Sequence, residues 1–260
     1  MPTVETVRSR IWSEEAEPDD PFTARLCRCA GFDVYGEILN KGGYFDYLIL
    51  LFRGERPAAN QSRALEHLAI ALANPGVRDY SVRAAMNGGV GGSNNAASLM
   101  AALAVGAGQY AGARDLYLAC ELWRECGTDL DAWARRLTEP PAHWSDSHWP
   151  TVEHTPGFEP HAVRRALPVT QTLDVVAQHG VPGIDWLRAS IDELETVAGR
   201  PLAMSGVAAA TFSGLGFAPE QAEMLYLILR LPGAAAHALE QKDFGWRHYP
   251  FFGDGLELTK

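Results

Sequence analysis

Residues 60–74, NQSRALEHLAIALAN, establish the fold class of this sequence. Apolar residues recur there at i, i+3, i+4 and i+7, the spacing of one face of an α-helix. Asn60 is suited to cap the start of this helix, and Pro75 follows its end. The pattern predicts a helix that buries one apolar face. The residues of that face are Leu65, Leu68, Ala69 and Leu72.

Similar helical patterns cover most of the chain on both sides of this stretch. Alternation with a period of two never lasts long enough to predict a strand, so the sequence predicts an all-α protein. Residues 96–107 and 234–238 are rich in alanine on all sides, which favours close packing in a helical interior or at a subunit interface. The further helices are expected at residues 46–54, 93–105, 111–125, 169–178, 184–198, 205–213, 219–229 and 233–242.

Two segments interrupt the helical patterns. Residues 87–95, NGGVGGSNN, are rich in glycine and open a helix, so their N–H groups can bind an anion at the helix N-terminus. Close helix packing beside a flexible turn is the alternative interpretation. Residues 140–160 hold five prolines, which forbid a continuous helix. This second segment is expected to be a lid or binding loop and to mark the domain boundary.

Histidine and cysteine spacing predicts no metal site. Four of the eight histidines fall between residues 143 and 161, but their gaps match no helix face and no established zinc spacing. The cysteines lack the two-residue spacing of zinc knuckles, and we expect reduced structural thiols. They are Cys27, Cys29, Cys120 and Cys126.

The formal net charge of −10 argues against a nucleic-acid partner, because binding to a phosphate backbone needs clustered lysine and arginine. No stretch reaches the roughly 18 apolar residues that a membrane span requires. The first 20 residues lack the charged and apolar regions of a signal peptide. We therefore expect a cytoplasmic protein without a membrane partner.

Several segments, in a single order, resemble conserved motifs of the citrate synthase superfamily. The resemblance runs from about residue 31 to the C-terminus, and the chain length resembles that of the short citryl-CoA lyase branch. GFDVYGEI (31–38) and FDYLILLFRGERP (45–57) resemble the N-terminal motif. GAGQYAGA (106–113) resembles the "GPLHGGA" turn, and TPGFEPHAVRR (155–165) the "PGFGHAV-R" loop. LAMSG (202–206), GLGFAP (214–219) and PGAAAHALE (232–240) resemble the C-terminal motifs.

The resemblance implies a homodimer of all-α subunits with an active-site cleft between two domains. Residues 1–150 and 215–260 would form the large helical domain, and residues 151–214 the small domain. The implied reaction forms or cleaves a carbon–carbon bond between an acyl-CoA enolate and a 2-keto acid such as oxaloacetate. The coenzyme A thioester would be a substrate, with no cofactor bound permanently.

The family uses one aspartate and two histidines for this chemistry, as a base and as donors to developing negative charge. The first histidine corresponds here to Tyr110, preceded by Gln109, and the loop histidine corresponds to His161. The aspartate corresponds to Ser205, whose hydroxyl cannot abstract a proton from carbon unaided. Glu159 is a candidate to replace that carboxylate.

Basic and polar residues complete the predicted site. Those expected to bind the coenzyme A thioester are Arg164, Arg165, Gly157 and Phe158. Those expected to bind the second substrate are Arg247, Asn87 and Asn94. A catalytically silent subunit that binds coenzyme A or a partner chain is the alternative function. The polar residues at the substituted positions favour altered chemistry over loss of activity.

Overall fold

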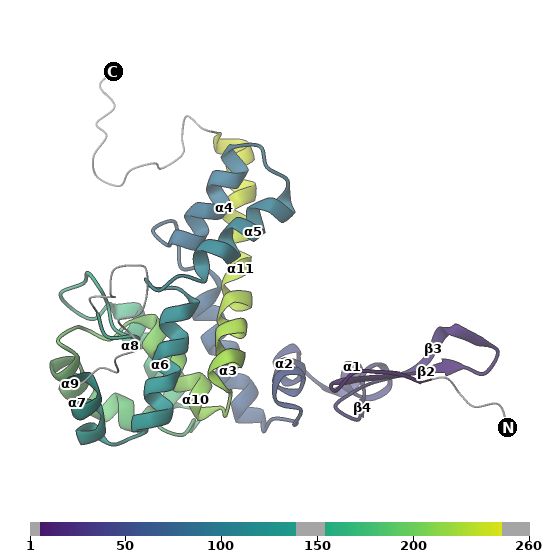
Figure 1. Ribbon diagram of the computed structural model, residues 1–260, viewed down its shortest axis with the longest axis horizontal. Helices are drawn as coiled ribbons and strands as arrows, with labels where there is room; N and C mark the ends of the chain where they lie inside the picture. Colours follow the sequence, from purple (N-terminus) through teal and green to yellow (C-terminus); the bar gives the residue numbers. More distant parts are fainter. Residues whose placement is uncertain (1–5, 139–153, 246–260) are drawn as a thin grey trace.

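The computed structural model describes residues 6–138 and 154–245, and its helices confirm the all-α class of the main body. Figure 1 shows α3 (Ala59–Ala73) beside the first half of α11 (Pro219–Phe244), and α4 (Tyr80–Val90) and α5 (Asn95–Gly106) beside its second half. None of the helices in the described ranges is long and apolar enough to cross a membrane.

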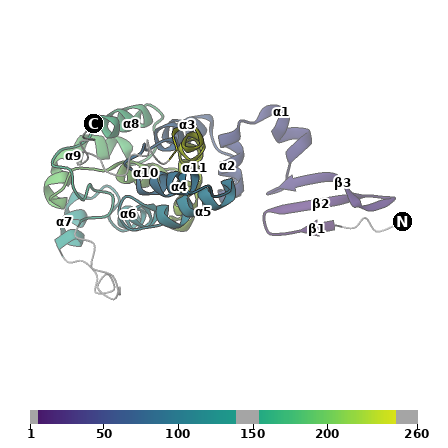
Figure 2. The same ribbon diagram turned by 90° about the horizontal axis from the view of Figure 1, so that it is seen from above.

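A small antiparallel sheet at the N-terminus corrects the expectation of no strands. Its strands pair in chain order, with register shifts between β2 (Trp12–Glu17) and β3 (Asp20–Cys29) near Ala16. The first six residues of β3 are exposed, so the sequence there carries no alternation between buried and exposed residues. Figure 2 shows the sheet at the opposite end of the molecule from α7 (Leu130–Thr138) and α9 (Ile184–Ala198). The strands are β1 (Thr6–Arg8), β2 (Trp12–Glu17), β3 (Asp20–Cys29) and β4 (Phe32–Asp33).

A short linking segment joins this sheet to the helical body. It consists of η1 (Val34–Ile38), a π-helix, and α1 (Leu39–Lys41), and it leads into α2 (Tyr44–Arg53). Cys29, Ile38 and Leu50 form a small buried cluster between the sheet and α2. The sheet therefore has a contact of its own with the body, separate from the main core.

Most expected helices are confirmed within a few residues. They are α2, α3 (Ala59–Ala73), α5 (Asn95–Gly106), α6 (Ala113–Cys126), α8 (Leu167–Ala177), α9 (Ile184–Ala198) and α10 (Met204–Gly214). The helices α4 (Tyr80–Val90) and α7 (Leu130–Thr138) were not expected. Asp79 caps α4 by accepting hydrogen bonds from the N–H groups of Ser81 and Val82.

The two helices expected at residues 219–229 and 233–242 are one helix, α11 (Pro219–Phe244), of 26 residues. Pro232 lies inside it and is exposed. The ring of Pro232 removes one backbone donor without ending the helix, because packing on both sides stabilises the continuation.

Packing of α4 supports the close-packing interpretation of the glycine-rich segment, whereas anion binding at the start of α5 stays a prediction. A methyl group added at Gly88 would press on Ser98 of α5, and one added at Gly89 would overlap the carbonyl of Ala238 in α11. Small side chains also fill the core between these helices. The glycines therefore permit close approach of three helices. The residues of this core are Val82, Ala85, Met86, Ala102, Ala234 and Ala238.

The main hydrophobic core joins α2, α3 and α6 to α11. It contains residues such as Leu116 from the predicted large domain and Phe212 from the predicted small domain. The predicted division at residues 150 and 215 stays a prediction.

Candidate active site

A cavity of about 500 Å³ brings together side chains from separate parts of the chain. Tyr80 begins α4, Tyr110 lies in the turn between α5 and α6, and Arg200 follows α9. The segment before α8 supplies the rest of the lining: His154, Pro160 and His161. Phenol, imidazole and guanidinium groups therefore border one space, a combination that can bind a carboxylate or polarise a carbonyl oxygen.

A buried carboxylate lies behind this lining. Asp115, on the first turn of α6, has an Oδ1 atom 3.3 Å from Nε2 of His154, and both side chains are 2% exposed. The same Oδ1 accepts a hydrogen bond of 3.3 Å from the N–H of Gly157. The Nδ1 atom of His154 is buried and has no hydrogen-bond partner among the described residues. The ring of Tyr110 stacks on this imidazole, with centroids 5.6 Å apart.

The turn that carries Tyr110 is held by a buried arginine. Ala111, the next residue, has a φ of 53°, a left-handed conformation that costs free energy for a residue with a Cβ. Arg230 of α11 donates a hydrogen bond of 3.1 Å to the carbonyl oxygen of Ala111. It also forms an ion pair with Asp79, the cap of α4. Arg230 thus fixes the turn between two helices.

Glu159 lies beside the cavity and is half-buried. Burial raises the pKa of its carboxyl above the ordinary value of 4.5, and the negative charge of Asp115 raises that pKa further. His154 and His161 oppose these effects and lower the pKa of Glu159. Glu159 therefore shares the electrostatic environment of the buried pair, but its side chain does not line the cavity, so its role as a replacement carboxylate stays a prediction.

The predicted catalytic residues do not all reach the cavity. Tyr110 and His161 line it together, whereas Gln109 is half-buried outside its lining. Ser205, in the first turn of α10, is 3% exposed, and its hydroxyl has no partner among the described residues.

Gly157 and Phe158, predicted to bind coenzyme A, are buried against the start of α10. The N–H of Ala203 donates to the carbonyl of Gly157 at 3.0 Å, and the ring of Phe158 lies in the main core. A methyl group added at Gly206 would overlap the carbonyl of Gly157. These residues hold the segment that carries His154 and His161 close to α10.

The predicted arginines border a second, open cavity of about 660 Å³. Arg165 is engaged by Glu195 at 2.9 Å and Asp192 at 3.3 Å, which neutralises its charge. Arg164 is exposed. Arg200 lines both cavities, so the two lie on either side of one side chain.

The residues predicted to bind the second substrate lie elsewhere. Asn94 caps α5 by accepting a hydrogen bond of 2.8 Å from the N–H of Ala97. Asn87 is exposed near the end of α4. Neither residue lines the two cavities described above. Arg247 lies outside the described residues, as does the predicted loop up to residue 153.

Sequence reasoning missed Asp115, Arg200 and Arg230, and considered His154 only as a metal ligand. The helical spacing of the sequence could have identified Asp115. This residue stands four residues before Ala119 and seven before Leu122, on the buried face of the predicted helix, where a carboxylate needs a partner. Within the described ranges, no group of three or more histidine, cysteine or acidic side chains is placed to hold a metal ion.

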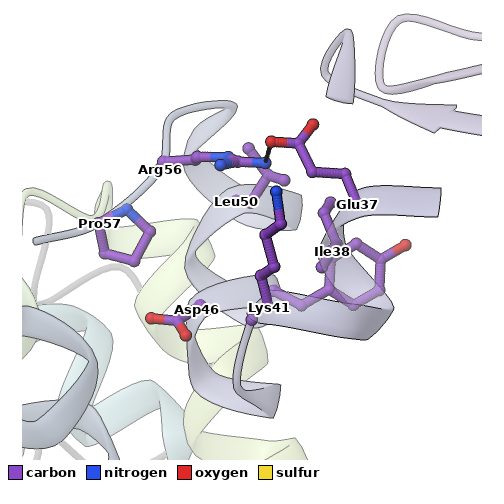
Figure 3. Close-up of a pocket in the computed structure, with 9 residues that line it drawn as sticks. Glu37, Ile38, Lys41, Asp46, Leu50, Arg56 and Pro57 are labelled. Atoms are coloured by element: carbon purple, nitrogen blue, oxygen red, sulfur yellow. Dashed lines mark ion pairs between the residues drawn. The ribbon is translucent and has the colours of Figure 1, made fainter. Parts of the chain in front are cut away.

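A third hollow, of about 180 Å³, lies where the linking segment meets α2 (Figure 3). Glu37 and Arg56 form an ion pair of 2.6 Å beside it, and Lys41 and Asp46 also line it. None of the predicted site residues lies there, so the cavity at Tyr110 is the candidate active site.

No protein-family model matches the chain, and no curated protein matches its sequence. Solved structures do match. Citryl-CoA lyase from Hydrogenobacter thermophilus superposes with a TM-score of 0.68 at 19% identity, over 90% of each chain. This chain has the citrate synthase fold.

Larger proteins contain the same fold. ATP citrate lyase from Methanothrix soehngenii, solved with citrate and coenzyme A, matches with a TM-score of 0.67 at 16% identity. The match covers 91% of this chain and 40% of that one. Citrate synthase from Thermoplasma acidophilum matches with a TM-score of 0.57 at 14% identity, over 84% of this chain and 58% of that one. The chain thus spans less than two thirds of the length of the ATP citrate lyase and of the citrate synthase.

Proposed function

We propose that this protein is a citryl-CoA lyase-like enzyme. It cleaves or forms the carbon–carbon bond between an acyl-CoA enolate and a 2-keto acid such as oxaloacetate. The observation that carries the proposal is the cavity in which Tyr110, His161 and Arg200 meet beside the buried Asp115–His154 pair. The shared fold with citryl-CoA lyase supports the same reaction class.

The reaction needs donors wherever negative charge develops. The phenol of Tyr110 donates to the thioester oxygen as the enolate forms, and His161 donates to the carbonyl oxygen of the keto acid. The guanidinium of Arg200 binds a carboxylate of the same substrate. Each of these groups lines the cavity, so one bound substrate can contact all of them.

The coenzyme A portion is proposed to extend into the second cavity. The exposed Arg164 is the better candidate for its phosphates, because Arg165 is already paired with two carboxylates. Coenzyme A enters as part of the substrate, and the mechanism requires no permanently bound cofactor.

A silent subunit that binds coenzyme A is the second candidate. The observation that favours it is Ser205, which stands where the family aspartate is expected and whose buried hydroxyl has no hydrogen-bond partner in residues 6–138 and 154–245. In that case the cavity would bind an acyl-CoA without turning it over.

We also propose a homodimer located in the cytoplasm. The helix α5 has no charged residue, and it exposes Met100 and Val105 to 66% and 46%. Such an apolar helix face fits a second copy of the chain. The four buried free thiols fit a reducing compartment.

The test of function is incubation of the purified protein with citryl-CoA. Acetyl-CoA and oxaloacetate are followed by mass spectrometry, and coenzyme A binding is measured by calorimetry on the same sample. Formation of both products supports the lyase. Tight binding without cleavage supports the silent subunit, and no binding contradicts both proposals.

A further inference from the structure

We propose that His154 is the proton carrier of this site and that Asp115 is its positioning residue. The inference rests on the proposed lyase activity and names the base that the serine at position 205 leaves missing. Among the residues that line the cavity, His154 has a carboxylate at one ring nitrogen, and its second ring nitrogen has no partner in the part of the chain that the structure describes.

The position of Asp115 selects the tautomer of the imidazole. A carboxylate only accepts hydrogen bonds, so its Oδ1 atom at 3.3 Å favours the proton on Nε2. The lone pair then lies on Nδ1, the nitrogen that has no partner within the described residues. The N–H of Gly157 holds the same carboxylate oxygen in place. This arrangement of base and orienting carboxylate is the one that general-base histidines use.

Glu159 is the less suitable base. Its backbone N–H is tied to the carbonyl of Pro201 at 2.8 Å, and its side chain does not line the cavity. His154 does line the cavity, although its Nδ1 atom is screened from water. This role of His154 requires the ring of Tyr110, which stacks on the imidazole and is 42% exposed, to move aside so that substrate contacts Nδ1.

The cleavage step balances with one proton and no cofactor. Nδ1 of His154 takes the proton of the tertiary hydroxyl of citryl-CoA, and the O–H electron pair becomes the second bond of the new keto group. The adjacent carbon–carbon bond breaks, and its electron pair forms the enolate of acetyl-CoA. The imidazolium then returns the proton to the enolate carbon, which gives acetyl-CoA and oxaloacetate. Asp115 stabilises the imidazolium between the two transfers.

Kinetics of single variants test the role of His154. We expect His154→Gln to lower kcat for citryl-CoA cleavage by at least about 100-fold, the usual contribution of general acid–base catalysis. Asp115→Asn should lower kcat and displace the acidic limb of the kcat–pH profile, and Asp115→Glu should restore part of both. His237→Gln, on α11 outside the cavity, is the control for loss of a histidine. A His154→Gln enzyme with the kcat and pH profile of the parent overturns the inference.

Nitrogen-15 NMR of the imidazoles tests the dyad without any turnover. We expect the His154 signal to report a proton on Nε2 in the parent and a changed tautomer balance in Asp115→Asn. A proton on Nδ1 in the parent overturns the inference even in an active enzyme. If the parent does not cleave citryl-CoA, the proposed function fails, and the catalytic role of His154 fails with it. The NMR result still decides whether Asp115 holds the proton of His154 on Nε2.

Discussion

Tyr110 combines a strained backbone neighbour, an exposed phenol and a stacking contact with a buried imidazole. We expect Tyr110→Phe to lower turnover of citryl-CoA by roughly 100-fold, because the oxyanion would lose a donor. Steady-state kinetics and circular dichroism measure the effect and check the fold. Tyr35→Phe, at a 62% exposed tyrosine outside the cavity, is the matched control. Unchanged turnover would remove Tyr110 from the mechanism.

Glu159 should make stability depend on pH. Its pKa is raised in the folded state, so the folded protein holds this proton more tightly than the unfolded chain does. The stabilising contribution is present below the ordinary value of 4.5 and is lost as the pH rises through the raised pKa. The Glu159→Gln variant does not lose stability in this way, because its amide does not titrate. Thermal unfolding is measured as the pH rises from 4.5 through the raised pKa of Glu159. The Tm of the variant should rise relative to the Tm of the parent. A difference in Tm that stays constant with pH would contradict the raised pKa of Glu159.

Arg164 and Arg165 are neighbours that differ in their partners. We expect Arg164→Ala to weaken coenzyme A binding by roughly tenfold, the loss of one charge-assisted hydrogen bond. The loss should shrink at high salt. Arg165→Ala should affect binding less and stability more, because Arg165 is paired with Glu195. Calorimetry at low and high salt makes the comparison, with the exposed Arg188→Ala as control. Equal losses of affinity would contradict this difference.

Close approach of helices is the property that the glycine-rich segment provides. We expect Gly89→Ala to destabilise the protein by about 1–3 kcal/mol, the cost of overpacking, although alanine favours a helix. Asn87→Ala, at an exposed position of the same α4, should leave stability unchanged or slightly higher. Urea unfolding measures both variants. A Gly89→Ala protein as stable as the parent would show that α4 and α11 can move apart.

The helices that the sequence predicted are those with a regular apolar face or a clear start and end. The helix α4 was missed because its glycines suggest a turn, whereas contacts with Ser98 and Ala238 make glycine necessary there. The β3 strand was missed because most of it is exposed. In the site, Tyr110 and His161 were predicted from motifs. The pairing of Asp115 with His154 joins segments 39 residues apart, which helical spacing does not reveal.

The proposed dimer gives a prediction for the molecule as a whole. We expect sedimentation equilibrium to report twice the mass of the chain. Met100→Glu should give a folded monomer, because an interface would have to bury an unpaired carboxylate. Ile70→Glu, at an apolar residue of α3 that is 68% exposed, is the matched control and should stay dimeric. A dimer that survives Met100→Glu would place the interface away from α5.

The residues that line the cavity lie at the start of a helix and in connecting segments rather than on the buried faces of helices, a placement that favours evolvability. Tyr80 is half-exposed at the first residue of α4, and His161 and Arg200 lie in connecting segments. Exposed positions of this kind usually tolerate substitution at small cost in stability. Substrate preference can therefore change at Tyr80 and Arg200 while the core, the donor His161 and the buried Asp115–His154 pair stay intact. A library randomised there should yield mostly folded proteins, from which new acyl-CoA specificities can be selected.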